Sequence, residues 1–224
     1  DTLCRESVTY TVRRNNIEVA ASHRFCNAAP VTIAIYYGMQ SMFEGETHVL
    51  TPGGAYTDWT EAAKASTFTK QKYPLFRRYV EKNRQGYQST WLLPDGLGDH
   101  ALLDGQDDIF IYAPYGKSYH KLIGNKRMEN GDKTCWRGVY TWFETPVADD
   151  ADLLCYEGSV GGHTAVFIDC KRACKRTLAL PGYLDLRHFG AAEQNGGIRI
   201  SAAGRNKLKI KADAPGSCVL LLRE

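Results

Sequence analysis

The sequence predicts a mainly β protein, a large antiparallel β-sandwich with a short helical insertion at about residues 57–85. Three observations predict this class. Apolar and polar residues alternate in many short segments, clusters of Gly, Pro, Asp and Asn separate these segments, and the longest apolar run, residues 30–43, is rich in β-branched and aromatic side chains. A chain of 224 residues can form one such sandwich, so we expect a single domain over 1–224.

The N-terminal segments predict a meander. Residues 7–12 and 17–25 alternate on either side of the turn at 13–16, which is typical of a β-hairpin. Residues 31–37 follow after a second turn, and both faces of that segment are apolar enough to be covered. We therefore expect three antiparallel strands in sequence, the third of them central.

The helical insertion is predicted from capping and from the spacing of apolar residues. A brief strand at 48–50 precedes Asp58, which has Glu61 three residues later, as in a capping box. Pro74 suits the first position of a second helix that ends near Gly86, because its missing N–H would be unpaired there in any case. One apolar stripe of this helix would comprise Leu75, Phe76, Tyr79 and Val80.

The remaining chain predicts strands again, separated by turn residues. The expected strands are 89–93, 109–113, 118–123, 136–144, 153–157, 163–170, 183–188, 198–202, 207–211 and 218–222. The last three are expected to form a meander.

Composition and charge limit the partners. The net charge of +3, from 28 basic and 25 acidic residues, gives no electrostatic reason to expect nucleic acid. No apolar stretch approaches the roughly 18 residues of a membrane-spanning helix. A local basic cluster, Lys171, Arg172, Lys175 and Arg176, is interpreted as a solvated turn. The oligomeric state is left open.

Cysteines and the first residue bear on localisation. Seven cysteines are an odd number, so at least one is free or pairs between chains if the rest are oxidised; small buried thiols with one or two bridges are favoured over metal binding. The chain starts at Asp1 and contains no Asn-x-Ser/Thr sequon. These features suggest a secreted or periplasmic bacterial protein, for which a removed N-terminal segment could also serve as a surface anchor.

Aromatic and polar side chains supply the candidate binding residues. Trp and Tyr stack on the apolar faces of sugar rings while their polar atoms form hydrogen bonds, although each alone is more often a core residue. Residues 115–121 add Lys, Tyr and His side chains that could bind hydroxyl groups. The candidate ligand-binding residues are Tyr37, Gln40, Tyr56, Trp59, Trp91, Lys117, Tyr119, Tyr140 and Trp142.

Acid–base chemistry could come from two histidines. His100 or His120 would act as acid or base with Asp99 or Glu44 as partner. The Asp-rich loop 95–108 could ligate calcium, but its spacing matches no EF-hand and Asp-Gly is ordinary turn chemistry, so no metal and no cofactor is expected. Whether the protein is an enzyme stays open.

Two short motifs resemble the galactose-mutarotase-like super-sandwich of carbohydrate-active proteins. Residues 25–30, Phe-Cys-Asn-Ala-Ala-Pro, precede a strand that ends Tyr36-Tyr37-Gly38, and residues 138–141 read Gly-Val-Tyr-Thr. In that superfamily a strand, an Asn-containing turn and a strand lead into the sugar site. Its aldose epimerases carry a catalytic histidine just after that strand, where this chain has Gly38, Met39 and Gln40. The resemblance thus implies sugar binding rather than epimerisation.

Two functions are consistent with this reading. The first is an exported carbohydrate-binding or carbohydrate-active protein that holds sugar on an aromatic-lined sheet face. The second is a non-catalytic interaction or structural module, in which the aromatic residues are core.

Overall fold

The computed structural model describes residues 2–42, 48–50, 57–58, 67–69, 78–93, 107–112, 117–194 and 196–222. Within these ranges the chain is mainly β and its sheets are antiparallel, which confirms the predicted mainly β class. No α-helix occurs in these ranges, and no helix there is long and apolar enough to cross a membrane. The chain divides into two compact units, described separately below, and the single domain over 1–224 stays a prediction.

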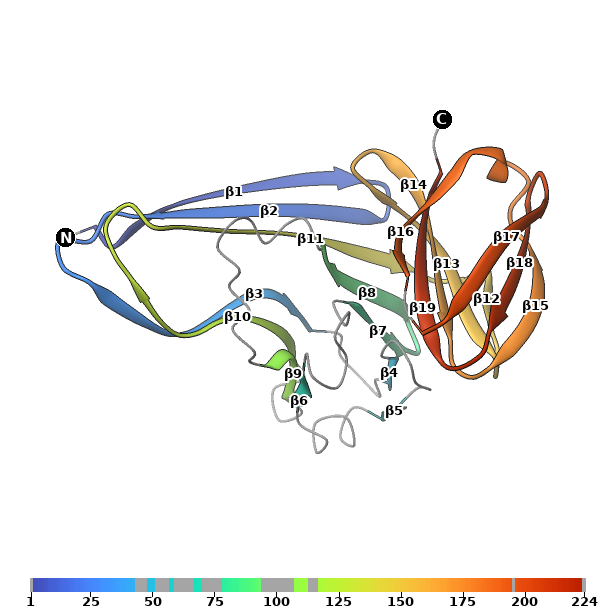
Figure 1. Ribbon diagram of the computed structural model, residues 1–224, viewed down its shortest axis with the longest axis horizontal. Helices are drawn as coiled ribbons and strands as arrows, with labels where there is room; N and C mark the ends of the chain where they lie inside the picture. Colours follow the sequence, from blue (N-terminus) through green and yellow to red (C-terminus); the bar gives the residue numbers. More distant parts are fainter. Residues whose placement is uncertain are drawn as a thin grey trace. The chain divides into compact units, whose positions relative to one another are not determined.

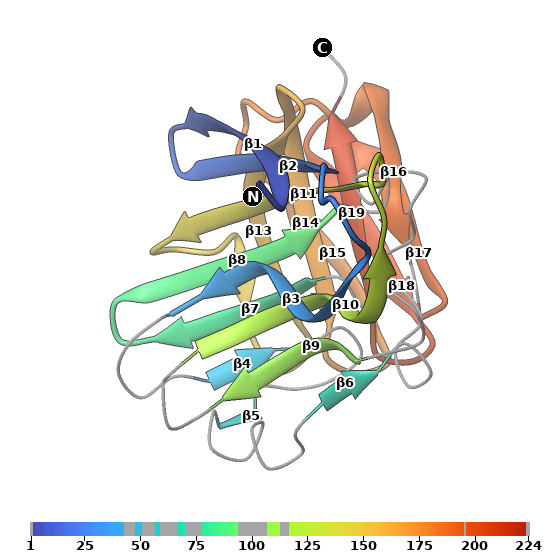
Figure 2. The ribbon, with the colours of Figure 1, turned by 90° about the vertical axis from the view of Figure 1, so that its left-hand side faces the viewer.

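Unit 1 comprises residues 1–49, 57–84 and 88–141. Its strands are β1 (Cys4–Arg13), β2 (Asn16–Phe25), β3 (Val31–Ser41), β4 (His48–Leu50), β5 (Thr57–Asp58), β6 (Thr67–Thr69), β7 (Arg78–Asn83), β8 (Gly86–Leu92), β9 (Asp107–Tyr112), β10 (Lys117–Met128) and β11 (Lys133–Phe143). They form a seven-stranded sheet in the order β1-β2-β11-β8-β7-β4-β5 and a four-stranded sheet in the order β3-β10-β9-β6. Figure 1 shows β1 and β2 as a long hairpin, and Figure 2 shows the strands of the smaller sheet.

The two sheets of unit 1 bury one apolar layer between them. Strands β2, β8 and β11 of the larger sheet contribute alternate residues to it, because successive side chains of a strand point to opposite faces. The smaller sheet contributes residues of β3 and β10. The buried members are Val19, Ala21, Met39, Leu92, Leu122, Ile123 and Trp136.

Unit 2 comprises residues 50–56, 85–87 and 142–224. Its strands are β12 (Ala148–Asp149), β13 (Leu153–Val160), β14 (His163–Cys170), β15 (Cys174–Ala179), β16 (Phe189–Gln194), β17 (Ile198–Gly204), β18 (Lys207–Ala212) and β19 (Gly216–Leu222), with a 3-10 turn, η3 (Leu186–His188). A five-stranded sheet, β12-β13-β14-β19-β16, packs on a three-stranded sheet, β15-β18-β17. This is a small sandwich with its own core, which includes Val166, Leu208 and Leu220.

A column of aromatic rings lies on the other face of the five-stranded sheet, because Tyr156 and Phe167 alternate along β13 and β14 with the residues that enter this core. Tyr87, Phe143, Tyr156 and Phe167 stack in that order, with ring centroids 4.7, 4.4 and 4.8 Å apart and interplanar angles of 10° or less. The Tyr87 hydroxyl donates to Asp149 at 2.8 Å, which satisfies its polar end. These rings therefore pack on one another rather than forming an open platform.

Several expected elements are corrected by the structure. Residues 78–83 form strand β7 and residues 84–85 a turn instead of a helix, while residues 74–77 of the expected second helix and residues 59–66 of the first lie outside the described residues. Strand β3 lies at an edge and pairs with β10, not with β2, so no three-stranded meander forms. Similarly, β17 and β18 pair, but β19 belongs to the other sheet. Residues 183–188 form turns and η3 in place of a strand.

Candidate functional site

A buried polar cluster surrounds Glu81 in unit 1. Tyr79 and Glu81 are two residues apart on β7, so their side chains lie on the same face of that strand. Ser118 and His120 share one face of β10 for the same reason. The hydroxyls of Ser41 and Ser118 donate to the two oxygens of the Glu81 carboxylate, each at 2.8 Å. The Tyr79 hydroxyl lies 2.8 Å from Ser41 Oγ, and the Tyr79 ring stacks on His120 with centroids 5.4 Å apart. Both sheets thus meet at one hydrogen-bonded carboxylate.

Burial sets the protonation of this cluster. It raises the pKa of Glu81 to about 7, against the opposing effect of the two serine donors. It also raises the pKa of Tyr79 well above its ordinary value, an effect to which the neighbouring Glu81 adds. Glu81 and His120 are both fully buried. The cluster can therefore hold a proton, but in this arrangement no dissolved substrate can reach His120, a predicted catalytic residue.

Two of the predicted sugar-binding residues contact one another. The Tyr140 hydroxyl donates to the backbone oxygen of Gln40 at 2.9 Å and accepts from its backbone N–H at 3.0 Å. Tyr140 thereby closes part of the free edge of β3. Burial raises the pKa of Tyr140 to about 12, so the phenol remains a donor at neutral pH. This phenol supports the fold, and its hydroxyl is already engaged.

The other predicted residues are dispersed. Trp91 is 2% exposed and packs in the interior, so its indole presents no face to a ligand. Tyr37, Lys117 and Trp142 are half-buried. The structure does not describe Glu44, Tyr56, Trp59, Asp99, His100 or the side chain of Tyr119.

The outer face of the three-stranded sheet of unit 2 is strongly basic. Register places Lys175, Lys211 and Arg199 in one row across β15, β18 and β17, and Thr177, Lys209 and Ser201 in a parallel row. All six residues are exposed, because the opposite face of each strand carries the side chains that enter the core.

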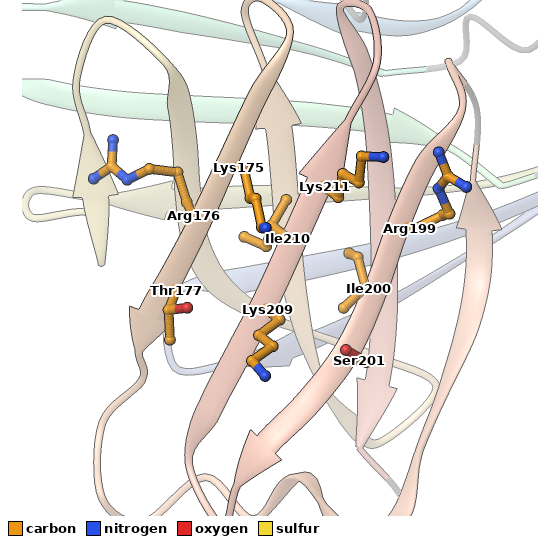
Figure 3. Close-up of a pocket in the computed structure, with 9 residues that line it drawn as sticks. All are labelled: Lys175, Arg176, Thr177, Arg199, Ile200, Ser201, Lys209, Ile210 and Lys211. Carbon is orange, nitrogen blue, oxygen red and sulfur yellow. The ribbon is translucent and has the colours of Figure 1, made fainter.

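These rows line a shallow pocket of about 260 Å³, shown in Figure 3. Asp213 is an acid next to it: its carboxylate pairs with Arg199 and lies 3.5 Å from Lys211. No ion pair within the described part of the chain involves Lys175 or Lys209. This pocket therefore presents unneutralised ammonium groups beside two side-chain hydroxyls.

The basic cluster expected to be a solvated turn divides into different roles. The Lys171 side chain is 8% exposed and pairs with Asp149 at 2.5 Å. Arg172 pairs with Asp152, and Arg176 pairs with Asp150 at 2.9 Å and with Asp152. Lys175 alone joins the exposed basic face. The ion pairs anchor the start of β15, which positions Lys175 in its row.

Comparison with known proteins finds no family model, no curated protein and no solved structure that matches this chain. Among the residues described, no group of three or more His, Cys, Asp and Glu side chains is arranged to hold a metal ion.

The basic face was not predicted from the sequence, although part of its signal is visible there. Residues 207–211 alternate Lys and apolar residues, which places three lysines on one face of a strand. Lys175 was interpreted as part of a solvated turn, so it could not be aligned with them. Pairing of β15, β18 and β17 is what brings the cations together.

Proposed function

We propose that the protein binds an acidic carbohydrate on the outer face of β15, β18 and β17. The observation that carries the proposal is the pair of exposed rows, Lys175–Lys211–Arg199 and Thr177–Lys209–Ser201, around one pocket. This retains the carbohydrate ligand expected from the sequence and assigns it to a charged face instead of an aromatic one.

Electrostatics favours an anionic ligand. Neighbouring strands lie about 4.8 Å apart, so adjacent cations of a row repel one another by roughly 1 kcal/mol even in water. An anion placed between them would replace this repulsion with attraction. Lys207 extends the basic face along β18, and Asp213 is an acid beside its cations. The excess of cations on this face exceeds the net charge of +3 of the whole chain.

The hydroxyl groups favour a sugar over a bare polyanion. Thr177 and Ser201 flank Lys209 in the same row, and each hydroxyl can both donate and accept, as sugar hydroxyls do. The pocket of about 260 Å³ is close to the lower end of the range for small-ligand pockets, roughly 300 to 1,000 Å³, which suits one sugar unit at a time. Acidic polysaccharides occur outside cells, in agreement with the export expected from the sequence.

Calorimetric titration tests the proposal with four probes: heparin, polygalacturonate, neutral dextran and duplex DNA. We expect binding to at least one acidic polysaccharide, none to dextran, and weaker binding to DNA. The double variant Lys175→Glu/Lys209→Glu should lose about tenfold or more in affinity, since each reversal removes roughly 1 kcal/mol. The matched control Arg24→Glu/Lys133→Glu makes the same charge change on exposed, paired residues of β2 and β11 and should bind as the wild type does.

Three results would overturn the proposal: no binding to either acidic polysaccharide, dextran binding as tight as heparin binding, or DNA binding that equals heparin binding. The last would assign the face to nucleic acid. Thr177→Ala/Ser201→Ala separates the two ligands further, because it should weaken polysaccharide binding and leave DNA binding unchanged.

A further inference from the structure

We propose that strand β1 pairs with β1 of a second copy of this chain, joining the two seven-stranded sheets into one continuous sheet. This interaction surface lies in unit 1 and is independent of the carbohydrate site.

β1 is the terminal strand of its sheet and is exposed along nearly its whole length. Among the residues that the structure describes, its ten residues pair with β2 on one side only, and β1 heads the strand order. Tyr10 is 66% exposed and Val12 69% exposed. An edge strand with unpaired backbone groups and uncovered apolar side chains is a template for a further strand. The strand also lacks proline and a bulge, two devices that commonly block such pairing.

The free hydrogen-bonding groups of β1 belong to its even-numbered residues. Arg13 and Asn16 flank a two-residue turn, and residues in that position exchange both of their backbone hydrogen bonds. Odd-numbered residues therefore bond to β2, as the bond from Cys26 N to Leu3 O continues to show beyond the strand. Val8, Tyr10 and Val12 turn their N–H and C=O groups outward.

The same even-numbered residues carry the apolar side chains. Val8 packs against the core layer of unit 1, and Tyr10 and Val12 lie on that face opposite Val19 and Ile17. Val19 and Ile17, both on β2, belong to the core layer, whereas Tyr10 and Val12 beside them remain exposed. A second sheet joined at this edge would extend the apolar face past them.

Self-complementarity identifies the partner as a second copy. In an antiparallel pair with Tyr10 opposite Tyr10 of the second copy, Val8 faces Val12 of the second copy. On the other face of the strand, Ser7 lies opposite Arg13 of the second copy, and the twofold axis repeats each contact. Apolar pairs across strands each contribute about 0.2–1 kcal/mol, and no like charges face one another in this register. Shifting the register by two residues, to place Thr9 opposite Thr9, would set Arg5 against Arg13 and so bring like charges together.

Sedimentation velocity over a range of concentrations tests the pairing, with reductant present because Cys4 is a half-buried free thiol on β1. We expect a reversible dimer. Tyr10→Pro removes an outward N–H and no bond to β2, so it should give a folded monomer, whereas Tyr10→Phe should dimerise as the wild type does.

A charge substitution tests the register itself. Ser7→Arg should weaken the dimer about tenfold, since each of its two copies then faces Arg13 of the other chain, and Ser7→Arg/Arg13→Glu should restore it. This pair of variants decides the matter even if Tyr10→Pro unfolds the hairpin. A wild-type protein that stays monomeric at all concentrations, or a double variant no tighter than Ser7→Arg, would overturn the proposal.

Discussion

At the scale of single residues, Glu81 makes stability depend on pH. Its pKa is raised to about 7 in the folded protein because burial disfavours the charged carboxylate. The folded state therefore binds more protons than the unfolded state between about pH 4.5 and 7, and the free energy of unfolding falls as pH rises through this range. Once the pH is above about 7, the free energy of unfolding has fallen by about 3 kcal/mol in total.

Urea denaturation at pH 5 and pH 8.5 measures this effect. Glu81→Gln keeps the size of the side chain, and the hydroxyls of Ser41 and Ser118 can rotate to bond the amide. We expect the variant to lose most of the difference between the two pH values. Should the variant keep the wild-type pH dependence, the buried carboxylate would not be its source.

Gly138 provides a second test at this scale. A Cβ atom built there would lie 2.1 Å from Sδ of Met39, which is fully buried between the sheets of unit 1. We expect Gly138→Ala to lower the free energy of unfolding by about 1–3 kcal/mol, because the methionine must leave its position. Met39→Val should recover part of this loss in the double variant.

The matched control is Gly182→Ala, whose Cβ would meet no atom within 4 Å. It should change stability by less than about 0.5 kcal/mol in the same denaturation experiment. Equal effects of the two substitutions would contradict the packing argument.

At the scale of elements, the free thiols of Cys170 and Cys174 lie close together where the chain passes from one sheet of unit 2 to the other. Cys170 ends β14 and Cys174 begins β15, and their Sγ atoms lie 3.8 Å apart. Burial raises the pKa of Cys170, which disfavours its reactive thiolate form. Cys174 is half-buried and therefore more accessible, so we expect an oxidant to react with Cys174 first. We expect oxidised glutathione to accept the two electrons and leave a Cys170–Cys174 disulfide, stabilising the unit by up to about 2 kcal/mol.

Peptide mapping by mass spectrometry identifies the pair. The wild-type protein should lose two hydrogens on oxidation, and Cys174→Ser should not form that intramolecular bridge. Bridges between other cysteines, with Cys170 and Cys174 still reduced, would contradict this assignment.

Most strands of the fold could be predicted from alternation, but β7 could not. Tyr79 and Val80 are adjacent, and both are buried because β7 is covered on both faces. Period-two alternation vanishes in such a strand, and the apolar residues then imitate the stripe of a helix. Glu81, which lies outside the apolar stripe predicted for that helix, is fully buried.

The candidate site was less predictable than the fold. Its cations are contributed by strands that are paired across a sheet but separated in sequence, and a single sequence does not reveal which strands pair. For His120 the sequence indicates a group capable of acid–base chemistry, but not that the side chain is fully buried. That burial depends on Tyr79 of β7, whose ring stacks on the imidazole. Composition identifies groups able to bind or react, whereas only packing decides which of them meet a ligand.

At the scale of the whole molecule, the two units share strands. The chain passes from one unit to the other within β8 and β11, at Tyr87–Gln88 and Thr141–Trp142. Because unfolding one unit removes hydrogen-bonded partners from a strand that continues into the other, we expect a single cooperative transition, as the predicted single domain requires.

Paired core substitutions test this coupling. Leu122→Ala in unit 1 and Leu208→Ala in unit 2 each remove a buried side chain, and each should lower the free energy of unfolding by about 2–5 kcal/mol. Either substitution should shift the whole urea transition. Two separate transitions, only one of which moves, would show that the units unfold independently.

The column of rings from Tyr87 to Phe167 contains no tryptophan, whereas the core layer of unit 1 contains Trp136. Rigidly held aromatic rings in a chiral setting give near-ultraviolet circular dichroism that disappears once specific packing is lost. The column therefore contributes an intrinsic optical signal, which the difference between the wild-type spectrum and that of a Tyr156→Phe variant identifies, and its loss on melting can be followed without any attached label.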